Sequence, residues 1–109
     1  MHELAIAESV VDTVAERLPG AQVTCVHLEI GALSGVVPDS IRFCFDLATE
    51  GTGLAGARLE ITEPPAWCRC RACGAEFRPD SPIVLCPCGS PDVAVLAGEE
   101  LKIVSVQVA

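Results

Sequence analysis

Five of the chain's seven cysteines lie close together, between Cys68 and Cys88. They fall into two groups, the run CRCRAC, which holds Cys70 and Cys73, and the run CPC, which holds Cys86 and Cys88. Zinc binds four thiolates at the corners of a tetrahedron, and a Cys-x-x-Cys turn lets two sulfurs converge on one ion. In a reducing environment, clustered cysteines are better explained by metal than by disulfides. The pattern therefore predicts a structural zinc site that holds a small unit together.

The exact ligand set depends on a short turn. The predicted zinc ligands are Cys70, Cys73, Cys86 and Cys88. The turn Cys86-Pro87-Cys88 is one residue tighter than a standard pair, so either it is distorted to reach the metal or Cys68 replaces one of its members. Buried or redox-active thiols are the alternative interpretation. Four cysteines leave no open position on the ion, which favours a structural role over zinc-dependent hydrolysis.

Hydrophobic patterns on both sides of the cysteines predict a fold of the α/β class, α+β type. Apolar residues recur at helical spacing over 4–18 and again after Pro38, and they alternate over 23–30 and 101–108, with a short strand at 57–62. We expect a small, mostly antiparallel β-sheet covered by two helices, with an inserted zinc-ribbon-like four-cysteine domain. The predicted domains are 1–64 with 98–109, and the insertion 65–97. Cys25 and Cys44 have apolar neighbours and are interpreted as core residues.

Composition excludes several functions. The formal charge of the 109-residue chain is -8, and a zinc ion on four thiolates makes it more negative, so nucleic acid is not an expected partner. The start MHELAIAESV has no basic region typical of a signal peptide, and no apolar run is long enough to span a membrane, so we expect a cytoplasmic protein. No catalytic set accompanies an open metal position, and His27 beside Glu29 is too little for an enzyme.

The amino end offers a second set of metal ligands. The α-amino nitrogen of Met1, the backbone amide of His2 and the His2 imidazole can close fused rings around one ion, and Glu3 can add a donor through its backbone amide or its carboxylate. Nitrogen-rich planar donor sets suit Ni(II) or Cu(II). The alternative interpretation is that His2 is a solvated residue at a frayed chain end.

The chain contains five blocks, spread from residue 1 to residue 108: MHELAIAESV, HLEIGALSGVVPDSIRFCFD, CRACGAEF, CPCGS and GEELKIVSVQV. In their sequence and their order these blocks resemble the HypA/HybF family of nickel metallochaperones for [NiFe] hydrogenase maturation. The resemblance implies transferable Ni(II) at Met1, His2 and Glu3, and structural Zn(II) at Cys70, Cys73, Cys86 and Cys88. The chain departs from the family's second Cys-Pro-x-Cys pair, because Cys86-Pro87-Cys88 lacks the intervening residue.

The same resemblance implies a function and partners. The expected function is binding of Ni(II) at the N-terminus and its delivery for [NiFe] hydrogenase maturation. The expected partners are the HypB GTPase, the hydrogenase large-subunit precursor and, in some organisms, urease maturation proteins. A zinc-ribbon module that binds proteins or nucleic acid without nickel is the alternative.

Overall fold

The chain folds into two compact units, and each is described by itself. The computed structural model describes residues 2–81 and 83–109. Unit 1 comprises Met1–Glu29, Val36–Thr62 and Lys102–Ala109, and unit 2 comprises Ile30–Gly35 and Glu63–Leu101. The cysteine-rich segment therefore belongs to unit 2, together with a short segment from much earlier in the chain.

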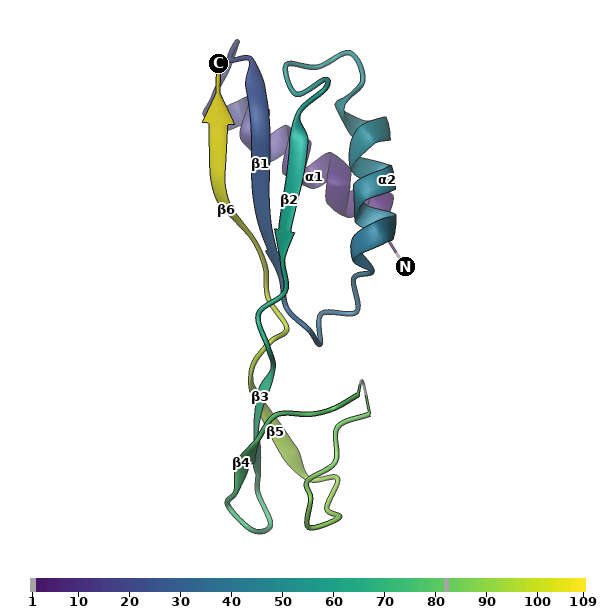
Figure 1. Ribbon diagram of the computed structural model, residues 1–109, viewed down its shortest axis with the longest axis vertical. Coiled ribbons are helices and arrows are strands. Elements are labelled where there is room, and N and C mark those ends of the chain that lie inside the picture. Colours follow the sequence, from purple (N-terminus) through teal and green to yellow (C-terminus); the bar gives the residue numbers. More distant parts are fainter. Residues whose placement is uncertain (1, 82) are drawn as a thin grey trace. The chain divides into compact units, whose positions relative to one another are not determined.

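Unit 1 contains a three-stranded sheet with the order β2-β1-β6 (Figure 1). The strands are β1 at Val23–Ile30, β2 at Arg58–Thr62 and β6 at Leu101–Val108. β1 and β2 run parallel, with Cys25 opposite Arg58, whereas β6 runs antiparallel to β1. The predicted fold class is confirmed, but the sheet is mixed rather than mostly antiparallel. The reason is that a helix connects β1 to β2, and such a crossover lets two neighbouring strands run in the same direction.

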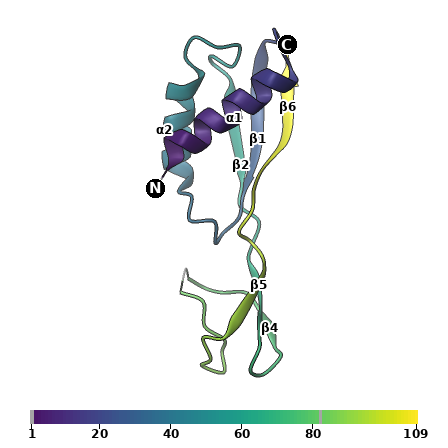
Figure 2. The same cartoon turned by 180° about the vertical axis from the view of Figure 1, so that it is seen from behind.

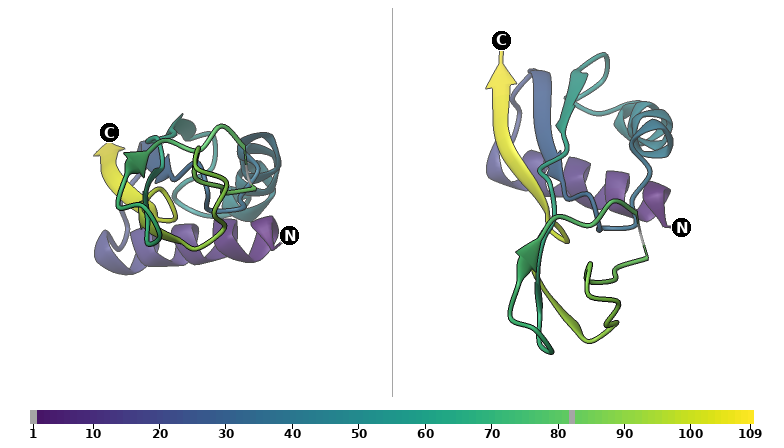
Figure 3. Two further views of the ribbon diagram at one scale, coloured as in Figure 1. Left: turned by 90° about the horizontal axis from the view of Figure 1, so that it is seen from below. Right: turned by 60° about the horizontal axis from the view of Figure 1, so that its bottom comes forward.

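Two helices complete unit 1. α1 spans Glu3–Arg17 and crosses one face of the sheet, and α2 spans Pro38–Thr49 and packs against α1 and β2 (Figures 2 and 3). Pro38 stands at the start of α2, where its fixed φ suits a helix and its missing N–H costs no hydrogen bond. Both helices bury an apolar stripe, and Ile41 and Phe45 of α2 are almost fully buried. The helical spacing read from the sequence thus marks the faces that form the core.

Unit 2 contains a second three-stranded sheet with the order β4-β3-β5. The strands are β3 at Trp67–Cys70, β4 at Glu76–Phe77 and β5 at Val93–Ala97. Both pairings are antiparallel, and Cys68 of β3 lies opposite Phe77 of β4. These strands were not among the sequence predictions, because they are too short to show a clear alternation of apolar and polar residues.

The segment Ile30–Gly35 belongs to unit 2 through backbone hydrogen bonds. The N–H of Gly31 donates to the carbonyl of Glu100 at 2.8 Å, and the N–H of Leu33 donates to the carbonyl of Gly98 at 2.7 Å. A third bond joins the N–H of Ala32 to the carbonyl of Pro64. Three stretches that are distant in sequence therefore cross at this point.

Gly98 is one of two glycines at this crossing, with Gly31, that leave no room for a side chain. Its φ is +111°, and a Cβ atom there would lie 2.6 Å from Cα and Cβ of Ala66. We expect Gly98→Ala to destabilise unit 2 by more than the roughly 1–3 kcal/mol of a strained backbone alone. Gly20→Ala is the matched control, because Gly20 also has a positive φ but has no atom within 4 Å of the added Cβ. Denaturant unfolding of both variants measures the difference, and equal losses would contradict the steric argument.

Candidate metal centres

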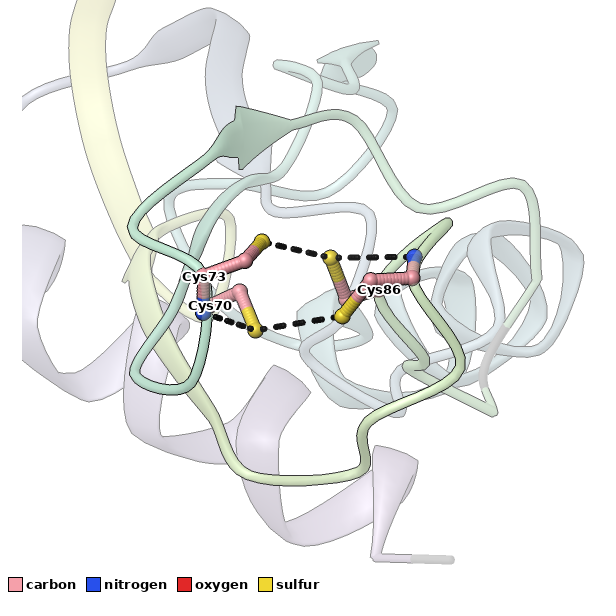
Figure 4. Close-up of side chains that lie close together, drawn as sticks. Cys70, Cys73 and Cys86 are labelled. Atoms are coloured by element: carbon pink, nitrogen blue, oxygen red, sulfur yellow. Dashed lines mark hydrogen bonds between the residues drawn. The ribbon is translucent and has the colours of Figure 1, made fainter.

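Four cysteine sulfurs of unit 2 converge on one point. The Sγ atoms of Cys70, Cys73, Cys86 and Cys88 all lie within 4.8 Å of one another. The Sγ atoms of Cys70 and Cys88 are 3.7 Å apart, and those of Cys73 and Cys86 are 3.6 Å apart. Figure 4 shows Cys70 and Cys73 facing Cys86 across the cluster. The structure therefore brings together the four residues that the sequence singles out.

Two tight turns position these sulfurs. The N–H of Cys73 donates to Sγ of Cys70, and the N–H of Cys88 donates to Sγ of Cys86, each at 3.4 Å. The first turn follows the end of β3 and is closed by a bond from the N–H of Gly74 to the carbonyl of Cys70. The second is closed in the same way by Gly89 and Cys86. The shortened Cys86-Pro87-Cys88 turn thus presents both of its thiols, and no residue from elsewhere is needed.

The surroundings shift the pKa values of Cys70 and Cys86 in opposite directions. The hydrogen bond from the backbone N–H of Cys73 lowers the pKa of Cys70 to about 6. The backbone N–H of Cys88 lowers the pKa of Cys86, but burial and the neighbouring thiols outweigh it and raise that pKa to about 12. Cys70 therefore loses its proton more readily than Cys86, whose thiol is buried among the other thiols. A divalent cation favours loss of the proton at both residues, because metal binding requires and stabilises the deprotonated thiols.

The geometry fits a zinc ion. Tetrahedral Zn–S bonds of about 2.3 Å place neighbouring sulfurs about 3.8 Å apart. The two measured separations, 3.6 and 3.7 Å, are close to that spacing. Cys70 and Cys86 are buried, whereas Cys73 and Cys88 are exposed, so the cluster reaches the surface of unit 2. This donor set can hold a soft or borderline cation such as zinc.

The remaining cysteines lie outside the cluster. Cys68 is 0% exposed within β3, and burial and then the nearby Glu99 carboxylate raise the pKa of its thiol. It does not replace a member of the Cys86-Pro87-Cys88 turn. Cys25 is buried in β1, as expected for a core residue, and Cys44 is half-buried in α2.

The predicted nickel ligands are at the start of α1, in unit 1. Met1 lies outside the described residues. His2 is exposed and is the N-cap residue of α1, and its imidazole forms no capping hydrogen bond. Glu3 is only 6% exposed, and its Oε2 accepts a hydrogen bond from the backbone N–H of Val37 at 3.4 Å. The two neighbouring residues thus have opposite environments: an accessible imidazole and a buried carboxylate.

A shallow pocket beside Glu3 contains a residue that the sequence predictions missed. Asp39 of α2 lines this pocket together with Glu3, Leu4 and Cys44. Burial raises the pKa of the Glu3 carboxyl, but hydrogen bonds from the backbone N–H groups of Glu3 and Val37 outweigh it, and the net pKa is below its usual value. Asp39 could have been noticed as an acidic residue in the first turn of the second helix, but the sequence did not indicate that this turn lies near the chain start. His27 bonds to Thr62 in the sheet and is not part of either centre.

The fold and the four-thiol cluster place the chain among small α+β proteins with cysteines that can hold a metal ion. The solution structure of the Ni metallochaperone HypA from Helicobacter pylori is similar, with a TM-score of 0.65 over 99% of this chain and 97% of that one. Its sequence is 21% identical, so the similarity concerns the fold. It confirms the expected α+β fold class.

Sequence comparison identifies the family. A family model described as "Hydrogenase/urease nickel incorporation, metallochaperone, hypA" matches residues 1–108. The hydrogenase maturation factor HypA of Nostoc punctiforme is 50% identical over 99% of this chain and 96% of its own length. The hydrogenase maturation factor HypA of Geotalea uraniireducens is 50% identical over 99% of both chains. The chain belongs to the HypA family.

Family membership confirms several sequence predictions. The chain is a member of a nickel metallochaperone family of hydrogenase maturation, and the family description names a metallochaperone rather than an enzyme. The relatives from Nostoc punctiforme and Geotalea uraniireducens carry the name hydrogenase maturation factor. Within residues 2–81 and 83–109, no helix has both the length and the apolar character needed to cross a membrane.

Proposed function

We propose that this chain binds Ni(II) at its amino end, through Met1, His2 and Glu3, and delivers it for [NiFe] hydrogenase maturation. The observation that carries the proposal is the exposed His2 directly after the chain start, in a member of a nickel incorporation family. An exposed His2 suits delivery, because ligands at an accessible site exchange one at a time, and protonation of His2 or of the amine weakens the site.

The zinc ion in this proposal has a structural role. Cys70, Cys73, Cys86 and Cys88 hold it, and they fill its coordination sphere, so that nickel transfer does not pass through this cluster. The corresponding domains are 1–64 with 98–109 for nickel and 65–97 for zinc. Residues Asp39 and Glu3 of one pocket add acidic side chains beside the amino end.

The proposed partners follow from the family. They are the HypB GTPase and the hydrogenase large-subunit precursor in the cytoplasm, with urease maturation proteins in organisms that produce urease. A zinc-ribbon module without nickel function is disfavoured, because the family model covers residues 1–108 and not the cysteine segment alone.

Metal stoichiometry tests the proposal. We expect the untagged chain to be purified with one tightly held zinc ion and to bind one added Ni(II) without releasing that zinc, because the two donor sets have no residue in common. Isothermal titration with Ni(II), followed by elemental analysis of the desalted protein, measures both ions. Release of one zinc for each nickel bound would show that nickel enters the cysteine cluster and would contradict the proposal.

A further inference from the structure

The Glu3 side chain is placed differently from the other proposed nickel ligands. Its carboxylate is in a buried position, whereas His2 beside it is exposed. A buried carboxylate needs partners, because removing a charge from water is costly unless hydrogen bonds replace the lost hydration. The partners of Glu3 therefore indicate what its side chain does.

One of those partners is the start of α2. The N–H of Val37, the N-cap residue of α2, donates to Glu3 Oε2 at 3.4 Å. Val37 has no side chain that can cap the helix, and no side-chain hydrogen bond from the N-cap residue itself is present. A carboxylate supplied from outside the helix performs this task, and its negative charge interacts favourably with the positive end of the helix dipole.

The contact joins two helices at the chain start. Glu3 is the first residue of α1, and the beginnings of α1 and α2 lie side by side in unit 1 (Figure 2). The backbone N–H of Glu3 also hydrogen-bonds to its own carboxylate, so one side chain serves the first turn of both helices. Because the carboxylate holds Glu3 in place, the nickel donors that precede it in the chain can adopt fewer positions. Fewer positions before binding mean a larger fraction of molecules ready to bind and a tighter apparent affinity.

We propose that Glu3 is a positioning residue. Its carboxylate anchors the amino end against the start of α2 and does not coordinate the nickel ion. This inference rests on the proposed nickel site. It concerns the role of the carboxylate, which the N–H of Val37 engages through Oε2.

Four variants separate anchoring from ligation. Glu3→Ala removes the carboxylate, and Val37→Pro removes the N–H that the carboxylate accepts while leaving Glu3 in place. We expect each to weaken Ni(II) affinity about fivefold to tenfold, the effect of losing a helix cap. Glu3→Gln keeps an oxygen acceptor for Val37 and should cost about twofold. Val37→Ala keeps the N–H and changes only a half-exposed side chain, so it should bind as the wild type does.

The opposite pattern would overturn the inference. If the carboxylate is a nickel ligand, Glu3→Gln and Glu3→Ala lose affinity equally and Val37→Pro keeps it. If all four variants bind like the wild type, the anchor has no effect on nickel. His2→Ala, titrated alongside, tests the nickel site itself: retained affinity in that variant refutes the proposed function, whereas lost affinity together with normal binding by Val37→Pro refutes only the anchor.

Amide hydrogen exchange at Val37 gives a second measurement without nickel. We expect its N–H to exchange faster in Glu3→Ala than in the wild type, and Glu3→Gln to restore most of the protection, because an amide oxygen accepts the same bond. Unchanged exchange in Glu3→Ala would show that the contact does not hold Val37 and would overturn the inference, even if Val37→Pro fails to fold.

Discussion

Cys73→Ala is expected to release the zinc ion and to unfold most of the segment Glu63–Leu101. Structural zinc contributes on the order of 10 kcal/mol to the folding of such small units. Unit 2 has few other sources of stability, since its strands are short and β4 contains only Glu76 and Phe77. Cys73 is exposed, so its replacement removes a ligand without opening a hole in the core. Elemental analysis and hydrogen exchange across the chain measure the two effects.

Cys44→Ala is the matched control for this experiment. Cys44 is a half-buried cysteine of α2 in unit 1, outside the four-sulfur cluster, and its loss should leave the zinc content unchanged. In Cys73→Ala, we expect α1 and β1 to keep their protection from exchange while β3 and β5 lose it. If the zinc content and the protease resistance of Cys73→Ala equalled those of the wild type, the ligand assignment would be wrong.

Blocking the terminal amine is expected to abolish nickel binding and to leave zinc in place. Acetylation turns the terminal amine into an amide, which binds a metal only after losing its proton, and a residue added before Met1 moves the amine away from the His2 imidazole. The chelate then loses the donor that begins its fused rings. We expect at least a hundredfold loss of Ni(II) affinity, about 2.7 kcal/mol or more. Isothermal titration of the acetylated and the unmodified protein measures it.

An extension after Ala109 is the control for the blocked amine. It adds the same number of residues at the other end of the chain, away from the proposed donors, and should bind nickel normally. His2→Ala should match the acetylated protein, because the imidazole is the second donor that no neighbouring side chain replaces. Undiminished nickel uptake by the acetylated protein would place the nickel site elsewhere in the chain.

Much of unit 1 was predictable from the sequence because its elements are long. Expected ranges of 4–18, 23–30 and 101–108 correspond to α1, β1 and β6 within one residue at each end. Each buries a stripe or a face that repeats over several residues, and such repetition is visible without a structure. The direction of β2 was not predictable in this way, because alternation along a strand does not say which way its neighbour runs.

Unit 2 was predictable only through its cysteines. The spacing of the cysteines identified the four residues whose sulfurs the structure brings together. The reason is that four thiolates that bind one zinc ion must lie close together in any backbone conformation. The strands of unit 2 were not predicted, because they are short and show no regular alternation of apolar and polar residues. The contact between Glu3 and Val37 was also not predicted, because nothing in a sequence shows which helix start a carboxylate will face.

The crossing at Gly98 has a consequence for any attempt to transplant the zinc-binding part. The segment Ile30–Gly35 is hydrogen-bonded to the backbone of Pro64, Gly98 and Glu100. A gene fragment that encodes only 63–101 would therefore lack this segment and its three hydrogen bonds. The cysteine-bearing part therefore cannot be moved to another protein as one continuous segment with all of its hydrogen bonds.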